Sequence, residues 1–172
     1  MDQLLPVRVV ANAVNVPKLH RYQIATKWSG NLGSGTSEYK AYSRDYEIIG
    51  PEKAGAILGS SDPAFRGDAS RYNPEDLLVS AVSACHMLWV LHLCADSGIV
   101  VVDYSDQAIG EMLEHPDGSG EFTLVTLYPK MTITDGSRVQ DAIKVHEEAN
   151  RVCALARSVR FPVKHEPAIL IA

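Results

Sequence analysis

The sequence Asn73-Pro-Glu-Asp-Leu-Leu-Val-Ser-Ala-Val-Ser-Ala-Cys85-His-Met-Leu-Trp-Val90 joins a helix start to a long apolar run. Asn73 suits the N-cap, Pro74 suits the first helical position, and the two acidic residues after it complement the positive end of the helix dipole. Gly98 can take the left-handed conformation that ends a helix. These signals predict a helix over residues 74–96. We expect it to be buried on all sides rather than to span a membrane, because the rest of the chain is mixed in character.

Cysteines occur in two predicted helices. Cys85 lies in the apolar run, and Cys153 ends the stretch His146-Glu-Glu-Ala-Asn-Arg-Val-Cys153. Two such thiols suggest thiol–disulfide chemistry, and a pair of inert core thiols is the alternative. The third cysteine, Cys94, lies on the far side of the first helix from Cys85, about 180° around it, and is interpreted as structural.

The bulk composition limits the possible functions. A chain of 172 residues is long enough for one domain with a real core. With 16 basic and 21 acidic residues, the net charge of −5 provides no basic surface for nucleic acid. Three widely spaced cysteines do not form a secreted disulfide framework. The chain opens without a secretory signal pattern, so we expect a cytoplasmic protein with no membrane partner.

The remaining pattern predicts a run of strands on each side of the long helix. Residues 1–20 are expected to form a loosely attached N-terminal arm, and residues 21–172 a single domain. The irregular loop Pro51–Tyr72 is long enough to be functional. A hairpin connection is expected at Pro116–Gly118. The order of strands and helices predicts an α+β fold with antiparallel sheets packed on two helices. The predicted strands are Arg21–Trp28, Thr36–Tyr42, Asp45–Ile49, Val100–Met112, Glu121–Thr134 and Val163–Ile171, and the second helix is Ser137–Ser158.

A reactive thiolate in apolar surroundings needs a positive group nearby, because burial raises the pKa of a thiol. Arg66 and Arg71, in the loop before the helix, are candidates, and Glu75 could orient such an arginine. Ten helical residues separate Glu75 from Cys85, about 15 Å along the axis and about 80° around it. A site that uses both residues is therefore more easily shared between two subunits of a two-fold dimer.

The histidines and the apolar neighbours of Cys85 have two readings each. His146 shares a helix face with Cys153 and could contact the site, but the sequence favours a cap on a polar edge, and the same applies to His86. Met87, Leu88 and Trp89 could line a pocket or pack in the core. Cys85-His86 and His92-x-Cys94 supply metal-ligand types, yet these side chains point in different directions on a helix, so no metal site and no cofactor are expected.

The segment Asn73-Pro-Glu-Asp-Leu-Leu, the ten-residue spacing from Glu75 to Ala-Cys85, and a second cysteine some seventy residues later resemble the OsmC/Ohr family. Trp28-Ser-Gly30 with Gly33-Ser-Gly35-Thr36 is similar to the first hairpin of the OsmC branch. The resemblance covers roughly residues 20–171. It implies an intertwined homodimer whose antiparallel sheets wrap around two long central helices, with two sites at the interface. It also implies a thiol-dependent reductase of organic hydroperoxides.

Residue by residue, the resemblance assigns peroxide attack to Cys85, resolution of the oxidised thiol to Cys153, and activation to Glu75 with an arginine. Arg66, nine residues before Glu75, is the first choice for this arginine, ahead of Arg71 and then Arg44. Two positions depart from the family pattern. His86 stands where phenylalanine is common, and Ala154 stands where proline usually follows the second cysteine, so the second helix is expected to continue past it.

These observations together predict a peroxidase that reduces organic hydroperoxides, and hydrogen peroxide more weakly. Its reaction would pass through a Cys85 sulfenic acid and a Cys85–Cys153 disulfide. The resemblance implies a lipoyl- or thioredoxin-type dithiol as the reductant. The alternative is an OsmC-like protein that binds a small molecule between its subunits without turning it over. A Ser/His/Asp hydrolase is disfavoured because the chain contains no Gly-x-Ser-x-Gly elbow.

Overall fold

A computed structural model describes residues 17–172. The predicted arm at residues 1–20 lies almost entirely outside this part of the chain. Strands and helices follow in the order β1 (Ala25–Trp28), β2 (Tyr46–Ile49), β3 (Ile57–Gly59), η1 (Pro63–Phe65), α1 (Pro74–Asp96), β4 (Val101–Asp106), β5 (Ile109–Glu114), β6 (Gly120–Leu127), β7 (Pro129–Ile133), η2 (Gly136–Arg138), α2 (Val139–Val152), β8 (Val163–His165) and β9 (Ala168–Ile171). The predicted α+β class is confirmed.

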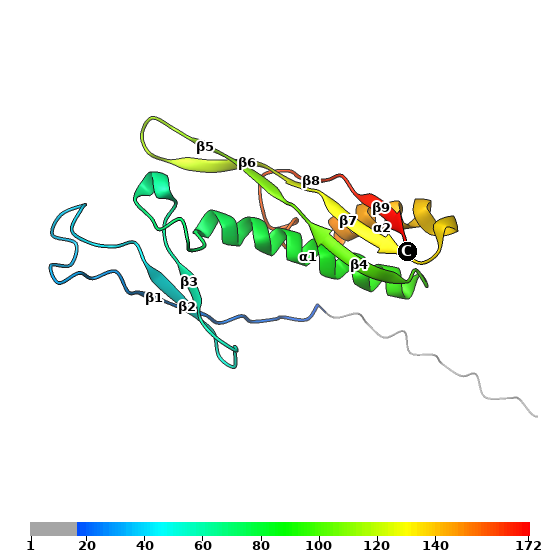
Figure 1. Ribbon diagram of the computed structural model, residues 1–172, viewed down its shortest axis with the longest axis horizontal. Helices are drawn as coiled ribbons and strands as arrows, with labels where there is room; N and C mark the ends of the chain where they lie inside the picture. Colours follow the sequence, from blue (N-terminus) through cyan, green and yellow to red (C-terminus); the bar gives the residue numbers. More distant parts are fainter. Residues whose placement is uncertain (1–16) are drawn as a thin grey trace, which may run out of the picture.

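The strands form three small sheets, with strand orders β1-β2-β3, β4-β7-β9 and β5-β6-β8. Neighbouring strands are antiparallel except that β8 runs parallel to β6 and β9 parallel to β7. Sheet β1-β2-β3 extends away from the body that α1, α2 and the other two sheets form (Figure 1). The hairpin predicted at Pro116–Gly118 joins β5 to β6, and His115 N–H donates to the carbonyl of Ser119 across it.

Each long predicted strand in the second half of the chain is divided into two. β4 and β5 are separated by Gln107–Ala108, and β6 and β7 by Tyr128. The Asp106 carboxylate fixes the backbone where these strands are interrupted. It accepts hydrogen bonds from Tyr128 N–H at 2.7 Å and from the Ser83 hydroxyl of α1 at 2.5 Å. One bent pair of strands therefore contributes to two sheets and is fastened to α1 at the bend.

The strand predicted at Thr36–Tyr42 is wrong, since these residues form turns and bends. In this segment, side chains form the hydrogen bonds to the backbone that a neighbouring strand would otherwise form. The guanidinium of Arg44 donates to the carbonyls of Tyr39 and Tyr42, and the side chain of Asn31 accepts from the amides of Gly33 and Gly35. The predicted loop Pro51–Tyr72 also contains β3 and η1.

The limits of α1 are confirmed, and its start is a complete capping box. The Asn73 side chain accepts from Asp76 N–H at 2.7 Å, and the Asp76 carboxylate accepts from Asn73 N–H at 3.2 Å. The expectation that this helix is buried on all sides is wrong for the single chain. One stripe at a spacing of four residues is buried, and the opposite face is exposed; the stripe is Val82, His86, Val90 and Cys94.

Helix α2 packs on the C-terminal half of that stripe. It buries Ala142, Val145, His146 and Ala149, and the two alanines allow the helices to approach closely. The helix begins at Val139 after the short η2 turn and ends at Val152, so the prediction Ser137–Ser158 is too long. Cys153 has an extended backbone, and the chain after it folds into turns before returning to pair β8 with β6. The helix therefore does not continue through Ala154.

Replacing Asn73 by alanine is expected to lower the free energy of unfolding by about 1 kcal/mol, because the first turn of α1 loses the acceptor for Asp76 N–H. Urea denaturation followed by circular dichroism measures this loss. Asn73→Ser, which keeps an acceptor, should recover most of it. An alanine variant as stable as the parent protein would contradict a stabilising role for the cap.

Candidate active site

The structure brings Cys85 and Cys153 into contact. The Sγ atoms lie 2.7 Å apart, and both cysteines are free thiols. Cys85 comes from the middle of α1, and Cys153 is the first residue after α2, so the packing of the two helices creates the pair. A disulfide between them needs little movement, because the sulfurs are already closer than in ordinary van der Waals contact.

The two thiols differ in their surroundings. Cys153 is fully buried and donates its hydrogen bond to Cys85, which is partly accessible. Burial, followed by the hydrogen bond to Cys85, raises the pKa of the Cys153 thiol. Cys94 is also buried, in the core cluster with Val90 and Ala149, and burial raises its pKa as well. The structural interpretation of Cys94 agrees with this position.

Arg66 lies at the end of η1, before α1. Asp62 caps this short turn by accepting from Ala64 N–H at 2.7 Å, and Arg66 follows it in a left-handed conformation with φ of 67°. Its side chain is exposed, with the guanidinium carbon 6.0 Å from the centre of the Tyr39 ring. Among residues 17–172, Arg66 has no carboxylate partner.

The other two candidate arginines are engaged within the chain. Arg71 lies between Asp45 at 3.7 Å and Asp68 at 3.5 Å. Arg44 donates to two backbone carbonyls and stacks on the rings of Tyr39 and Tyr42. Arg66 is therefore the candidate whose guanidinium is free to meet another carboxylate.

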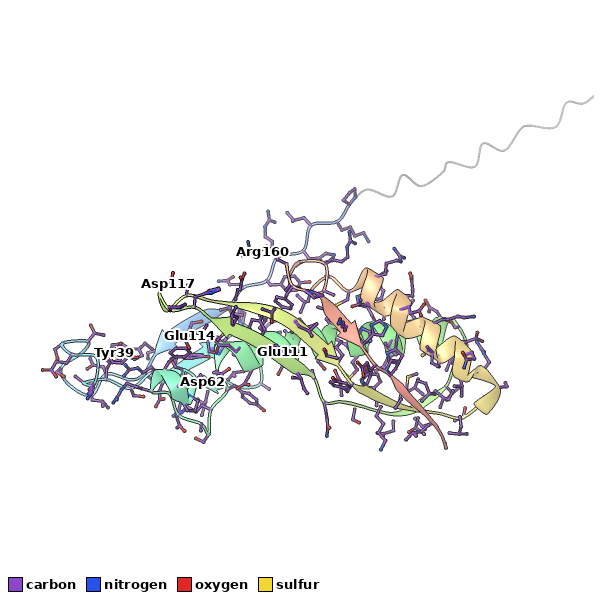
Figure 2. The ribbon with its side chains drawn as sticks, turned by 90° about the horizontal axis from the view of Figure 1, so that it is seen from above. Tyr39, Asp62, Glu111, Glu114, Asp117 and Arg160 are labelled. Atoms are coloured by element: carbon purple, nitrogen blue, oxygen red, sulfur yellow. The ribbon has the colours of Figure 1, made fainter. Side chains whose placement is uncertain are left out.

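Glu75 lies in the first turn of α1, on a cavity of about 440 Å³ whose walls include Asp62, Tyr72, Gly110 and Phe122. No hydrogen bond or ion pair of the Glu75 side chain occurs within the described part of the chain. In Figure 2, the labelled Tyr39 and Asp62 lie at the opposite end of the molecule from α2. Among residues 17–172, no hydrogen bond or ion pair links Arg66 or Glu75 to Cys85 or Cys153. Glu75 and Cys85 are ten residues apart on α1, about 15 Å along the helix axis, so one chain does not bring Glu75 to its own Cys85.

A pair of buried histidines lies beside the thiols. His86 Nε2 and His146 Nδ1 are 3.0 Å apart, and both side chains are inaccessible to solvent. Hence the expectation that these histidines cap a polar edge is wrong. The signal that could have found the pair is the i, i+3, i+4 and i+7 stripe of α2, because His146 occupies a core position between Ala142 and Ala149.

Two further aromatic residues surround this histidine pair. The His165 ring on β8 is 5.4 Å from the His86 ring, and the Tyr104 ring on β4 stacks on His146 at 6.3 Å. Burial, then the neighbouring His165, lowers the pKa of His86 to about 4. Burial, then His86 and His165, lowers the pKa of His146 to about 3. Both imidazoles are therefore neutral at physiological pH.

Two other predictions concern pockets and metals. Leu88 and Trp89 line a shallow cavity of about 180 Å³ with His92, and Trp89 also packs on the core. Within residues 17–172, no group of three or more His, Cys, Asp or Glu side chains is arranged to hold a metal ion. The histidine rings are stacked and tilted against one another, which does not direct their nitrogens to a common point.

The fold and site define an α+β protein with a cysteine pair formed between two helices. A family model described as "OsmC-like protein" matches residues 67–167, which is more than half of the chain. The chain therefore belongs to the OsmC-like protein family. A search of curated protein sequences found no match.

Solved structures with the same fold include an OsmC-like protein of unknown function from Vibrio cholerae. It is 26% identical, covers 87% of this chain and 100% of its own, and has a TM-score of 0.78. An organic hydroperoxide resistance protein from Elizabethkingia anophelis is 14% identical, covers 91% of this chain and 100% of its own, and has a TM-score of 0.63. The organic hydroperoxide resistance protein OhrB of Bacillus subtilis is 17% identical, covers 88% and 99%, and has a TM-score of 0.58. At such identities the last two structures support the fold alone.

The free energy of unfolding should fall as the pH drops from about 6.5 towards about 4. In this range the unfolded chain binds protons on His86 and His146 that the folded chain does not, so the stabilisation is complete above pH 6.5 and is lost below it. Each imidazole contributes a slope of at most about 1.4 kcal/mol per pH unit. Urea denaturation at several pH values measures it.

The matched control for this slope is the double variant His86→Gln/His146→Asn, which lacks the titrating rings. It should show a clearly flatter dependence, whereas replacement of the exposed His92 by glutamine should leave the slope unchanged. Equal slopes in the parent protein and the double variant would mean that these imidazoles do not titrate as buried groups.

Proposed function

We propose that this protein is a thiol-dependent peroxidase that reduces organic hydroperoxides, and hydrogen peroxide more weakly. The observation that carries the proposal is the contact between Cys85 and Cys153, with Sγ atoms 2.7 Å apart. Membership of the OsmC-like family, and structural neighbours named for organic hydroperoxide resistance, support the substrate class.

The reaction takes place in two steps. The Cys85 thiolate attacks one peroxide oxygen, the O–O bond breaks, and the alkoxide leaves as an alcohol after taking up a proton, so that Cys85 becomes a sulfenic acid. The thiol of Cys153 then displaces the hydroxyl of the sulfenic acid, which forms the disulfide and releases water. A dithiol of lipoyl or thioredoxin type would return both cysteines to thiols by disulfide exchange.

The assignment of the two roles follows from the surroundings of the thiols. Cys85 is partly accessible, so a peroxide can reach its sulfur. The same sulfur accepts the hydrogen bond from the Cys153 thiol. Cys153 is fully buried with a raised pKa, and it therefore stays protonated and protected until a sulfenic acid forms beside it.

Activation of Cys85 requires a second copy of the chain in this proposal. Arg66 has no carboxylate partner among residues 17–172, and the Glu75 side chain has no hydrogen bond or ion pair there, whereas arginine and glutamate side chains readily form bidentate ion pairs. In a two-fold dimer, one copy would supply the thiols and the other Glu75, which would orient an Arg66 guanidinium towards Cys85.

The exposed side of α1 supports the same dimer. By length and composition this helix could cross a membrane, with a mean hydropathy of 1.8, yet only 22% of its most apolar window is buried in the single chain. Leu88 on this helix is 61% exposed, and sheet β1-β2-β3 exposes Trp28 and Ile57. Burial of these apolar side chains against a second copy would stabilise the dimer by about 25 cal/mol for each Å² removed from water. This arrangement would leave no lipid-facing helix, in keeping with a cytoplasmic protein.

Peroxide titration of the reduced protein tests the catalytic claim. One equivalent of cumene hydroperoxide should remove two thiols rapidly and leave Cys94 free, with a Cys85–Cys153 link found by mass spectrometry. Hydrogen peroxide should react more slowly, because the surroundings of the site are apolar. Cys85→Ser should abolish the fast reaction, and Cys153→Ser should stop at a sulfenic acid that dimedone traps.

Thiols that oxidise no faster than a model thiol would contradict the peroxidase. A protein that still binds cumyl alcohol with unchanged affinity in the Cys85→Ser variant would then support the alternative, a family member that binds small molecules without turnover.

Mixing two inactive variants tests the shared site. In a dimer of one Cys85→Ser copy and one Glu75→Gln copy, a site built from both chains combines an intact Cys85 with an intact Glu75. Co-refolded mixtures should therefore recover up to about a quarter of the parent activity. Either variant alone should stay inactive, as should the mixture if each chain supplies a whole site, which would contradict the proposed arrangement.

A further inference from the structure

The hydrogen bond between His86 and His146 joins the same two helices as the cysteine pair. His86 follows Cys85 directly on α1, and His146 lies seven residues before Cys153, two turns back along α2. The bond and the thiol contact therefore lie along one interface. Apart from the contact between the thiols, the histidine bond is the only hydrogen bond between two side chains that joins these helices in the described chain; at the other end of α2, the side chain of Arg138 donates to the backbone carbonyl of Ser97 at the end of α1.

The buried histidine pair lowers the stability of the fold, because several polar atoms around it have no hydrogen-bond partner in the described chain. His86 Nδ1 and His146 Nε2 are buried without a partner among residues 17–172, and so are the Tyr104 hydroxyl and His165 Nδ1 beside them. Each such atom lowers the free energy of unfolding relative to an atom that has a hydrogen-bond partner. Apolar side chains of similar size would pack these helices with a smaller loss. Compared with apolar side chains, the imidazoles restrict how the two helices can be placed, because a hydrogen bond is strong only within a narrow range of distance and angle.

The apolar remainder of the interface does not fix the helices as narrowly. Beyond the histidines it consists of small buried side chains, such as Val90, Cys94 and Ala149, with the larger, partly buried Trp89 and Leu93 packed against them. Such contacts tolerate sliding by a fraction of a helical turn more readily than a hydrogen bond does. A slide of that size would separate the two sulfurs.

We propose that His86 and His146 are positioning residues: their hydrogen bond sets α1 against α2 so that Cys85 and Cys153 stay in contact, which accelerates closure of the disulfide. The inference rests on the proposed function for its place in a catalytic cycle, but the geometric claim can be tested without peroxide. A displacement of about 1 Å is enough to slow an intramolecular reaction about a hundredfold.

Substitution of the histidines by asparagine or glutamine separates the effect of the hydrogen bond from the effect of side-chain volume. Glutamine can place a polar atom near the position of Nε2 and asparagine near that of Nδ1. The bond uses Nε2 of His86 and Nδ1 of His146. His86→Gln and His146→Asn can therefore keep the bond, whereas His86→Asn and His146→Gln cannot. His92→Asn, at an exposed position of the same helix, is the control for substitution as such.

The first measurement is the equilibrium between the Cys85–Cys153 dithiol and oxidised dithiothreitol, which accepts the two electrons and two protons released as the disulfide forms. We expect the equilibrium constant to stay within about threefold of the parent protein in His86→Gln, His146→Asn and His92→Asn, and to fall at least about tenfold in His86→Asn and His146→Gln. Equal values within each amide pair would overturn the proposal, and so would values unchanged in all variants.

The second measurement separates the two steps with a peroxide pulse. Formation of the Cys85 sulfenic acid, followed in a Cys153→Ser background, should be unaffected by His86→Asn, whereas closure of the disulfide should slow at least about tenfold. A parent protein that forms the disulfide with oxidised dithiothreitol but ignores peroxide would contradict the proposed function and leave the positioning role in place. Normal peroxide chemistry with unaltered closure in His86→Asn would contradict the positioning role alone.

Discussion

The packing of α1 on α2 is the interaction on which the site depends. A long apolar helix presents one buried stripe, and a shorter amphipathic helix covers half of it. Neither helix carries a reactive pair by itself. Because α2 ends where it does, Cys153 leaves the helix directly beside Cys85, and the two thiols meet. The bent strands around Asp106 contact α1 at Ser83, two residues before Cys85, so both contacts help to position Cys85.

Local signals in the sequence were sufficient where the structure is local. The N-cap at Asn73 and the hairpin at Pro116–Gly118 depend on residues within a few positions of each other, and both were predicted correctly. The turns at Thr36–Tyr42 were not, because Arg44 and Asn31 satisfy the backbone there through their side chains. The end of α2 was also missed, since it is set by the return of the chain to β6 and not by a helix-breaking residue.

In the candidate site, too, features set by local sequence were predicted, and features set by contacts between distant residues were not. Cys85, Cys153 and Glu75 were predicted as site residues because their spacing resembles a known family, whereas composition and periodicity alone favour two inert core thiols. The histidine pair depends on a contact between positions sixty residues apart. No pattern within either helix predicts that two histidines will face each other, although a histidine in the apolar stripe of α2 marks a buried polar group that needs a partner.

Cys153 is the first residue after α2, so formation of a disulfide at Cys153 would change the backbone conformation near the end of this helix. The backbone of Cys153 is extended, and the turns after it are held by hydrogen bonds from Arg157 N–H to Cys153 and from Ser158 N–H to Leu155. The N–H of Cys153 also donates to the carbonyl of Ala149, so a sulfur that moves to form a disulfide pulls on these turns and on the last hydrogen bond of α2. Amide hydrogen exchange at residues 153–158 should therefore distinguish the oxidised protein from the reduced protein.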